Sequence, residues 1–334
     1  MYKYFKTISE VKDFILISNL LIIQNKQNQI FLEEKVIVEF GLDFRSWDNF
    51  VVFNDKEDNA NFYSLVTKNN IIKNSVSITN NKRETLFGIT NNNKLVEFEI
   101  SNSTINSFEY HILYNWENVM KIENSKILIW DKRKIKLFKI QLQFWELDLQ
   151  NELSLQNEIK IQQLFDVCDN LLWVLLTNYQ LVGIDVDSSS IIHNYFPLHN
   201  LMQTGLVYIN HLKYNKQENC VYFFEQGYFI QIQLATQQTQ LLWHNAEYDT
   251  GLSVIHDDYV YFVGGKRQSF FKNQIGVFDR KLNDVIWQTQ IKINGYESIQ
   301  QIEVASNKIY VRTTEGNLHI FEKEKVINLK ASSE

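Results

Sequence analysis

The sequence of 334 residues predicts an all-β fold, a β-propeller of four-stranded antiparallel blades that forms a single domain over residues 1–334. Short apolar runs rich in Val, Ile, Tyr and Phe alternate with polar turn residues, a pattern that favours antiparallel strands. A similar strand recurs about every 41 residues, a period typical of propeller blades. No long window has apolar residues at helical spacing, so we expect almost no helix.

The recurring strand has an apolar residue, then an aromatic or aliphatic residue, then usually a second apolar residue. Its eight copies begin at Leu21, Val51, Leu86, Ile127, Leu172, Val221, Val260 and Ile309. These copies predict eight blades. Seven blades, with the N-terminal strands closing the ring, is the alternative, because the first copies are closely spaced for four strands each. The ring must close in either arrangement, since open sheet edges pair with other chains.

Further strands surround the later copies in the order expected of a blade. A strand is expected after these copies at 95–100, 135–140, 181–186, 229–234, 275–279 and 318–322. The outermost strands are expected at 105–110, 144–149, 191–195, 241–243, 285–289 and 326–329. Innermost strands are expected at 119–122, 163–167, 211–214, 252–256 and 299–304. The polar segment 150–163 is the best candidate for a short helical or irregular excursion, and we place it between two blades.

The N-terminal apolar run Phe14–Ile23 is expected to form two core strands joined by a Ser18-Asn19 turn. It is too short to span a bilayer, and the polar pair interrupts it. Glu10 and Asp13 dilute the basic residues that a secretory signal needs. The chain has only 11 Gly and one Pro, so Asn, Asp, Lys and Ser must form most turns. Asn and Asp suit this role because they tolerate left-handed backbone.

Charge and cysteine content limit the classes of partner and compartment. A net charge of −6 argues against a nucleic acid or an anionic membrane as partner. In the basic run Asp131–Lys139, lysines partly alternate with apolar residues, as on a half-exposed strand. Cys168 and Cys220 form no CxxC pair and are expected to be free thiols in a reducing compartment. We therefore predict a cytoplasmic protein with neither a nucleic-acid nor a membrane partner.

Three stretches resemble the repeats of known propeller families. The stretch Asp258–Trp287, with Gly264-Gly265 after its first strand, resembles a kelch repeat. The stretch Leu181–Ser190 resembles a quinoprotein-type, or PQQ-like, blade, which places an Asp at the end of its third strand. The stretch Leu128–Asp131 resembles the Trp-Asp end of a WD repeat. Together the resemblances imply a propeller architecture. Quinoprotein dehydrogenases are secreted and typically have a vicinal disulfide, which the two distant cysteines do not form.

The motifs of common catalytic and metal sites are absent from the sequence. The seven histidines form no HxH, HExxH or i, i+4 pair, so we predict no metal site. Asp185-Val-Asp187-Ser-Ser-Ser begins like a calcium loop but lacks its later Gly and Glu, so we expect a polar turn. Gly265-Lys266 lacks the flanking residues of a phosphate loop, and no GxSxG occurs. We predict no cofactor and no catalytic residue.

Two loops carry large apolar residues where a turn needs only polar ones. Tyr195–Met202 leads from an outermost strand to the next innermost strand, and Lys266–Lys272 joins the second and third strands of its blade. Both connections emerge on the same face of an up-and-down blade. Exposed aromatic and Arg side chains favour partner contacts; the alternative is that each loop only caps its own blade. The predicted partner-binding residues are Phe196, Leu198, His199, Met202, Lys266, Arg267, Phe270 and Phe271.

Three functional hypotheses follow from this profile. The favoured one is a non-enzymatic module that binds another protein through its loop face, as an immunity protein that neutralises a toxin or as a scaffold subunit. The second is a hydrolase or lyase whose active site lies in the central channel, which requires three or more acidic or histidine side chains to converge there. The third is a propeller that binds a sugar or small ligand on Trp and Tyr faces.

Overall fold

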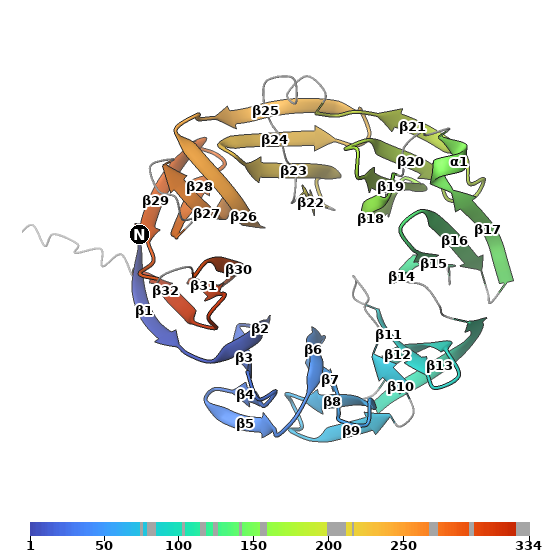
Figure 1. The fold of residues 1–334 in the computed structure, drawn as a ribbon, viewed down its shortest axis with the longest axis horizontal. Helices are drawn as coiled ribbons and strands as arrows, with labels where there is room; N and C mark the ends of the chain where they lie inside the picture. Colours follow the sequence, from blue (N-terminus) through green and yellow to red (C-terminus); the bar gives the residue numbers. More distant parts are fainter. Residues whose placement is uncertain are drawn as a thin grey trace, which may run out of the picture.

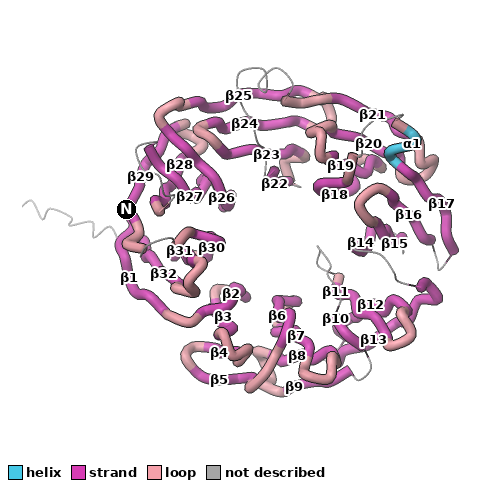
Figure 2. Tube along the Cα trace, in the orientation of Figure 1, coloured by secondary structure: helices cyan, strands magenta, loops and turns pink. Residues whose placement is uncertain are grey.

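The computed structural model describes residues 1–324, except 74–75, 79–84, 102–103, 114–117, 123–125, 140–141, 154–158, 199–211, 216, 267–272 and 294–296. Eight four-stranded antiparallel sheets stand around a common axis and form an eight-bladed propeller (Figure 1). The predicted fold class and blade number are confirmed, and the seven-blade alternative is wrong. Strands dominate the trace, and the described residues form one short helix (Figure 2).

Blades 1 to 4 follow one another along the chain, each with its innermost strand first. Blade 1 consists of β2 (Val11–Ile17), β3 (Leu20–Asn25), β4 (Ile30–Leu32) and β5 (Lys35–Val38). Blade 2 consists of β6 (Leu42–Trp47), β7 (Phe50–Asn54), β8 (Ala60–Ser64) and β9 (Asn70–Lys73). Blade 3 consists of β10 (Val76–Ile78), β11 (Leu86–Thr90), β12 (Lys94–Ser101) and β13 (Thr104–Leu113). Blade 4 consists of β14 (Asn118–Ile122), β15 (Lys126–Trp130), β16 (Lys134–Lys139) and β17 (Leu142–Asp148).

Blades 5 to 7 repeat this order, and blade 8 departs from it. Blade 5 consists of β18 (Ile161–Cys168), β19 (Leu171–Leu176), β20 (Leu181–Asp185) and β21 (Ile191–Tyr195). Blade 6 consists of β22 (Leu212–Asn215), β23 (Cys220–Glu225), β24 (Tyr228–Gln233) and β25 (Gln238–His244). Blade 7 consists of β26 (Tyr248–His256), β27 (Tyr259–Lys266), β28 (Gln274–Asp279) and β29 (Asp284–Gln290). Blade 8 consists of β30 (Ile299–Ala305), β31 (Lys308–Thr313), β32 (Leu318–Lys323) and the N-terminal strand β1 (Tyr2–Ile8).

Strand β1 closes the ring. It pairs antiparallel with β32, from Tyr2 opposite Lys323 to Ile8 opposite Leu318. The outermost position of blade 8 is therefore filled from the N-terminus rather than by residues 326–329, which lie outside the described residues. Two segments from opposite ends of the chain thus share one sheet, and the pairing covers the edge of β32.

The links between strands emerge on two opposite faces of the ring. We call the face that carries the links between second and third strands, and between blades, the loop face. The opposite face, with the links between first and second and between third and fourth strands, is the hairpin face. The predicted Ser18-Asn19 turn joins β2 to β3 on the hairpin face, with φ of 48° and 70°.

The core lies between blades. Among the described residues, buried apolar side chains group into eight clusters, one in each interface between neighbouring blades. Second strands such as β7 and β23 are buried along their whole length, because both of their faces pack against a neighbouring blade. Fully burying one Phe or Leu side chain contributes about 1.5–3 kcal/mol. The ring is therefore held mainly by apolar contact between adjacent sheets.

Helix α1 (Leu149–Glu152) follows blade 4 and precedes blade 5, and it overlaps the start of the segment 150–163, for which a short helical or irregular excursion was predicted. Its N-cap is Asp148, whose carboxylate accepts hydrogen bonds from the backbone N–H groups of Gln150 and Asn151. Among the described residues, no helix has the length and apolar character needed to cross a membrane.

Polar residues form the turns, as predicted from the scarcity of glycine. Of the 21 non-glycine residues recorded with positive φ, 15 are Asn, Asp, Ser or Lys. Such backbone is least costly for Gly, Asn and Asp. The remaining six all depart from this rule: Tyr179, Gln226, Gln237 and the three glutamates Glu10, Glu33 and Glu34.

Candidate functional site

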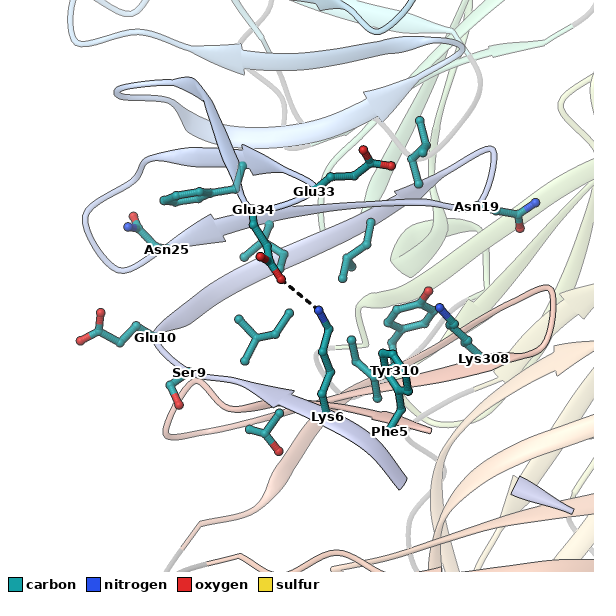
Figure 3. A pocket seen from close by; sticks show the side chains of 17 residues that line it. Phe5, Lys6, Ser9, Glu10, Asn19, Asn25, Glu33, Glu34, Lys308 and Tyr310 are labelled. Carbon is teal, nitrogen blue, oxygen red and sulfur yellow. Dashed lines mark hydrogen bonds and ion pairs between the residues drawn. The ribbon is translucent and has the colours of Figure 1, made fainter. Parts of the chain in front are cut away.

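A groove of about 730 Å³ runs along the interface where blade 8 meets blade 1 (Figure 3). We call it the seam groove. Its apolar lining comes from both ends of the chain and comprises Ile8, Leu20, Leu21, Ile23, Phe31, Tyr310 and Ile320. Its rim carries Phe5, Lys6, Glu10, Glu33, Glu34 and Lys308. The volume is within the range of about 300–1,000 Å³ that is common for binding sites.

A β-bulge in β1 orients the N-terminal wall of the groove. Tyr4 pairs with Phe321 and Lys6 pairs with Ile320, so Phe5 is an extra residue without a partner in the ladder. An extra residue shifts the alternation of side chains by one position. Phe5 and Lys6 consequently both line the seam groove, whereas Tyr4 lines a cavity on the blade 7 side of β1.

Phe5 is a large aromatic side chain that remains 49% exposed at the mouth of the groove. The Nζ atom of Lys308 lies 5.2 Å from the centre of the Phe5 ring, within range of a cation–π interaction. Below it, Ile320 and Tyr310 are buried in the cluster that joins blades 8 and 1. The groove therefore has a fixed apolar base and an exposed aromatic side chain at its edge.

An ion pair crosses the groove. The Nζ atom of Lys6 in β1 lies 3.2 Å from Oε1 of Glu34, which belongs to the β4–β5 turn (Figure 3). The Glu34 side chain is 83% exposed, and exposed ion pairs contribute about 1 kcal/mol or less to stability. A partner that supplies its own cation can therefore compete for this carboxylate at small cost.

Three glutamates around the groove have left-handed backbone. Glu33 and Glu34 form the two-residue turn between β4 and β5, with φ of 49° and 68°, and Glu10 follows β1 with φ of 62°. Two-residue hairpin turns of this kind favour Asn-Gly or Asp-Gly. Left-handed backbone costs a residue with a long side chain about 1–2 kcal/mol. The groove thus holds its carboxylates at a cost in stability.

Three of the residues predicted to bind a partner are described, and none of them lines the seam groove. Phe196 is 49% exposed, beyond the end of β21, and Lys266 ends β27 on the loop face, with its Nζ atom 3.8 Å from Glu247. Leu198 is 2% exposed and packs in the cluster between blades 5 and 6, so its side chain serves the core. The other predicted residues, His199, Met202, Arg267, Phe270 and Phe271, fall outside the described residues.

The seam groove was not predicted from the sequence, because the segments that line it from blade 1 and from β31 and β32 are more than 270 residues apart. The signals in the sequence were weak: an apolar strand at Tyr2–Ile8 and the pair Glu33-Glu34 between two short apolar runs. Neither shows that these segments meet, because their contact depends on ring closure.

Three charged side chains on innermost strands interact electrostatically. The pKa of Glu303 in β30 is raised by burial, an effect that Lys213 in β22 opposes and Asp13 in β2 reinforces. Within the described part of the chain, no three His, Cys, Asp or Glu side chains are grouped so that they could hold a metal ion. The hypothesis of an enzyme active in the central channel requires three or more acidic or histidine side chains to converge there, and it stays a prediction.

No protein-family model matches the chain, and no curated protein shows significant similarity to it. Solved structures match almost the whole chain at low identity. The C-terminal WD40 domain of Sif2 has a TM-score of 0.63 at 14% identity, covering 97% of this chain and 99% of its own. Sqt1 from Saccharomyces cerevisiae has a TM-score of 0.61 at 11% identity, covering 97% and 98%. BamB from Moraxella catarrhalis has a TM-score of 0.53 at 11% identity, covering 96% and 100%.

The chain is a divergent β-propeller. At identities this low, the similarity establishes the shared fold and no shared activity. The kelch-like and PQQ-like interpretations of individual blades stay predictions. In this propeller, Asp185 ends β20 and its carboxylate accepts hydrogen bonds from the backbone N–H groups of Asp187 and Ser188, at 3.1 and 2.7 Å. The predicted polar turn accounts for this aspartate.

Proposed function

We propose that this propeller is a non-enzymatic protein-binding module, and that its seam groove takes a partner segment with apolar side chains flanked by Lys or Arg. The observation that carries the proposal is the set of left-handed glutamates, Glu10, Glu33 and Glu34, around an apolar groove. Backbone strain at a ligand site persists where the strained residues have a function. Here the strain holds carboxylates in positions where Asn or Gly would be less costly.

The partner class follows from the chemistry of the groove. The apolar base and the exposed Phe5 suit one or two large apolar side chains, the kind of anchor that dominates protein interfaces. Three carboxylates against two lysines leave an acidic rim, with Lys6 already paired to Glu34. An acidic rim steers basic partners and disfavours acidic ones. Propellers of the WD40 type often act as protein-interaction scaffolds, which agrees with this role.

Neutralising a toxin and holding a complex together are two forms of this role. In both, the propeller provides a rigid surface and performs no chemistry. The identity of the bound partner distinguishes the two forms, so the first experiment must recover that partner and show which surface binds it.

The decisive variant is Phe5→Ser, and the chain offers a matched control. Phe144 is the extra residue of the bulge in β17, is 50% exposed and has Lys139 Nζ at 6.0 Å from its ring. Phe144→Ser therefore removes the same kind of side chain from a similar setting in blade 4. We expect Phe5→Ser to weaken partner binding about tenfold or more, with Phe144→Ser close to wild type.

Binding is measured in two ways. Affinity purification from the native host compares partner recovery by wild type and both variants, and peptides selected by display are titrated against all three proteins. Selected peptides should be rich in apolar and basic residues. Equal losses in both variants, or selection of acidic peptides, would contradict the proposal.

A further inference from the structure

A buried histidine on the other side of β1 has an unpaired nitrogen. His319 in β32 is 8% exposed and lies opposite Thr7 in β1. Its Nδ1 atom lies 3.0 Å from Thr7 Oγ1, whereas Nε2 has no hydrogen-bond partner within the described structure. A buried polar atom without a partner costs about 1–3 kcal/mol and calls for an explanation.

His319 lines a cavity of about 470 Å³ between blades 7 and 8. Four aromatic rings line the same cavity: Tyr2 and Tyr4 from β1, Trp287 from β29 and Phe321 from β32. The rings of Tyr2 and Trp287 are 5.4 Å apart, and those of Trp287 and Phe321 are 6.1 Å apart. Such a wall suits a flat apolar ligand, which can stack on one ring and meet the edge of another.

The polar groups of the cavity form a chain that can present a donor to a ligand. Tyr4 Oη lies 2.8 Å from Thr7 Oγ1, which in turn lies 3.0 Å from His319 Nδ1. If Tyr4 donates to Thr7, then Thr7 donates to Nδ1, and the imidazole proton resides on Nε2. Burial favours the neutral ring, which has a single N–H. The exposed Lys292 lines the same cavity and provides a cation.

We infer that the cavity between blades 7 and 8 binds a small planar carboxylate, with the aromatic rings around its body and His319 Nε2–H and Lys292 donating to the carboxylate. A carboxylate satisfies both donors at once, and charge-assisted hydrogen bonds are stronger than neutral ones. The site is distinct from the seam groove, because Thr7 is the only β1 residue that lines both, whereas Tyr2 and Tyr4 line this cavity and Phe5 lines the seam groove.

Indole-3-acetate and phenylacetate are the probes, and indole-3-acetamide is their matched uncharged control. Titration of the full chain by calorimetry should show saturable binding of the carboxylates and binding of the amide at least about tenfold weaker. Preference for the amide, or for 2-phenylethanol, would mean that Nε2 accepts rather than donates and would overturn the inference.

Two variants and one NMR experiment test whether the ligand binds in this cavity. His319→Phe keeps a ring of similar size but removes both nitrogens, and Lys292→Met removes the cation; each should weaken carboxylate binding about tenfold. In the wild type, the carboxylate should shift the imidazole resonances of His319 and leave those of the partly exposed His256, which lies outside the cavity, unchanged. Undiminished binding to His319→Phe, or an unshifted His319 resonance at saturation, would refute the site. Phe5→Ser should bind the probes like wild type, which separates this test from that of the seam groove.

Discussion

At the scale of single residues, some turn positions carry side chains that are unfavourable for their left-handed backbone. Most left-handed positions carry Asn, Asp or Ser, which keeps their cost low. Glu33 and Glu34 do not follow this rule, and both line the seam groove. A residue that lowers stability at a surface groove is better explained by binding than by folding.

The double substitution Glu33→Asn with Glu34→Gly should stabilise the protein. Asn-Gly suits the positive φ of both positions, so we expect the free energy of unfolding to rise by about 1 kcal/mol, measured by urea denaturation. The same variant should bind the partner more weakly. Asp169→Asn, in the β18–β19 turn at a φ of 50°, is the control and should change stability by less than about 0.5 kcal/mol. A destabilised double variant would show that the glutamates support the turn.

His319 should make stability depend on pH. Burial lowers the pKa of His319, and the nearby Glu297 only partly opposes that effect. Below the unfolded-state pKa of about 6.5, the unfolded chain takes up a proton that the folded protein excludes. Stability should therefore fall as the pH drops from 7.5 to 5.5. Urea unfolding at both pH values should show a smaller fall for His319→Phe. An equal fall in both proteins would assign the effect to other groups.

At the scale of single elements, the outermost strands share a structural device. Seven of the eight have an irregular ladder. In six of them a single apolar residue is left out, and these residues are Phe5, Ile37, Phe144, Ile192, Leu242 and Ile286. A bulge interrupts the ladder and increases the local twist. Outer edges that twist in this way are poor templates for pairing with another chain. In β1 the same bulge also places Phe5 and Lys6 together in the seam groove.

At the scale of the whole molecule, closure by β1 should hold the ring together. Removing residues 1–8 exposes the edge of β32 and the apolar side chains of Ile320 and Phe321. We expect this truncation to lower the free energy of unfolding by about 3 kcal/mol or more and to promote association, measured by urea denaturation and size-exclusion chromatography. Truncation after Glu324 is the control and should have little effect, because β1 already fills the outermost position of blade 8. Equal stability of both truncations would contradict this role of β1.

The sequence by itself determined the fold class, the number of blades and most strand positions, because these depend on local apolar patterns and turn residues. The eight strand copies from Leu21 to Ile309 are the second strands of the eight blades. It also determined that Ser18-Asn19 would be a turn.

Only the tertiary structure decided which segments meet where β1 closes the ring. Thr7 and His319 are 312 positions apart, yet their side chains lie within hydrogen-bond distance. No local pattern encodes that contact, since it exists only after all eight sheets have packed around the axis. The seam groove and the cavity beside His319 both depend on this closure, which is the physical reason that neither could be predicted from the order of residues.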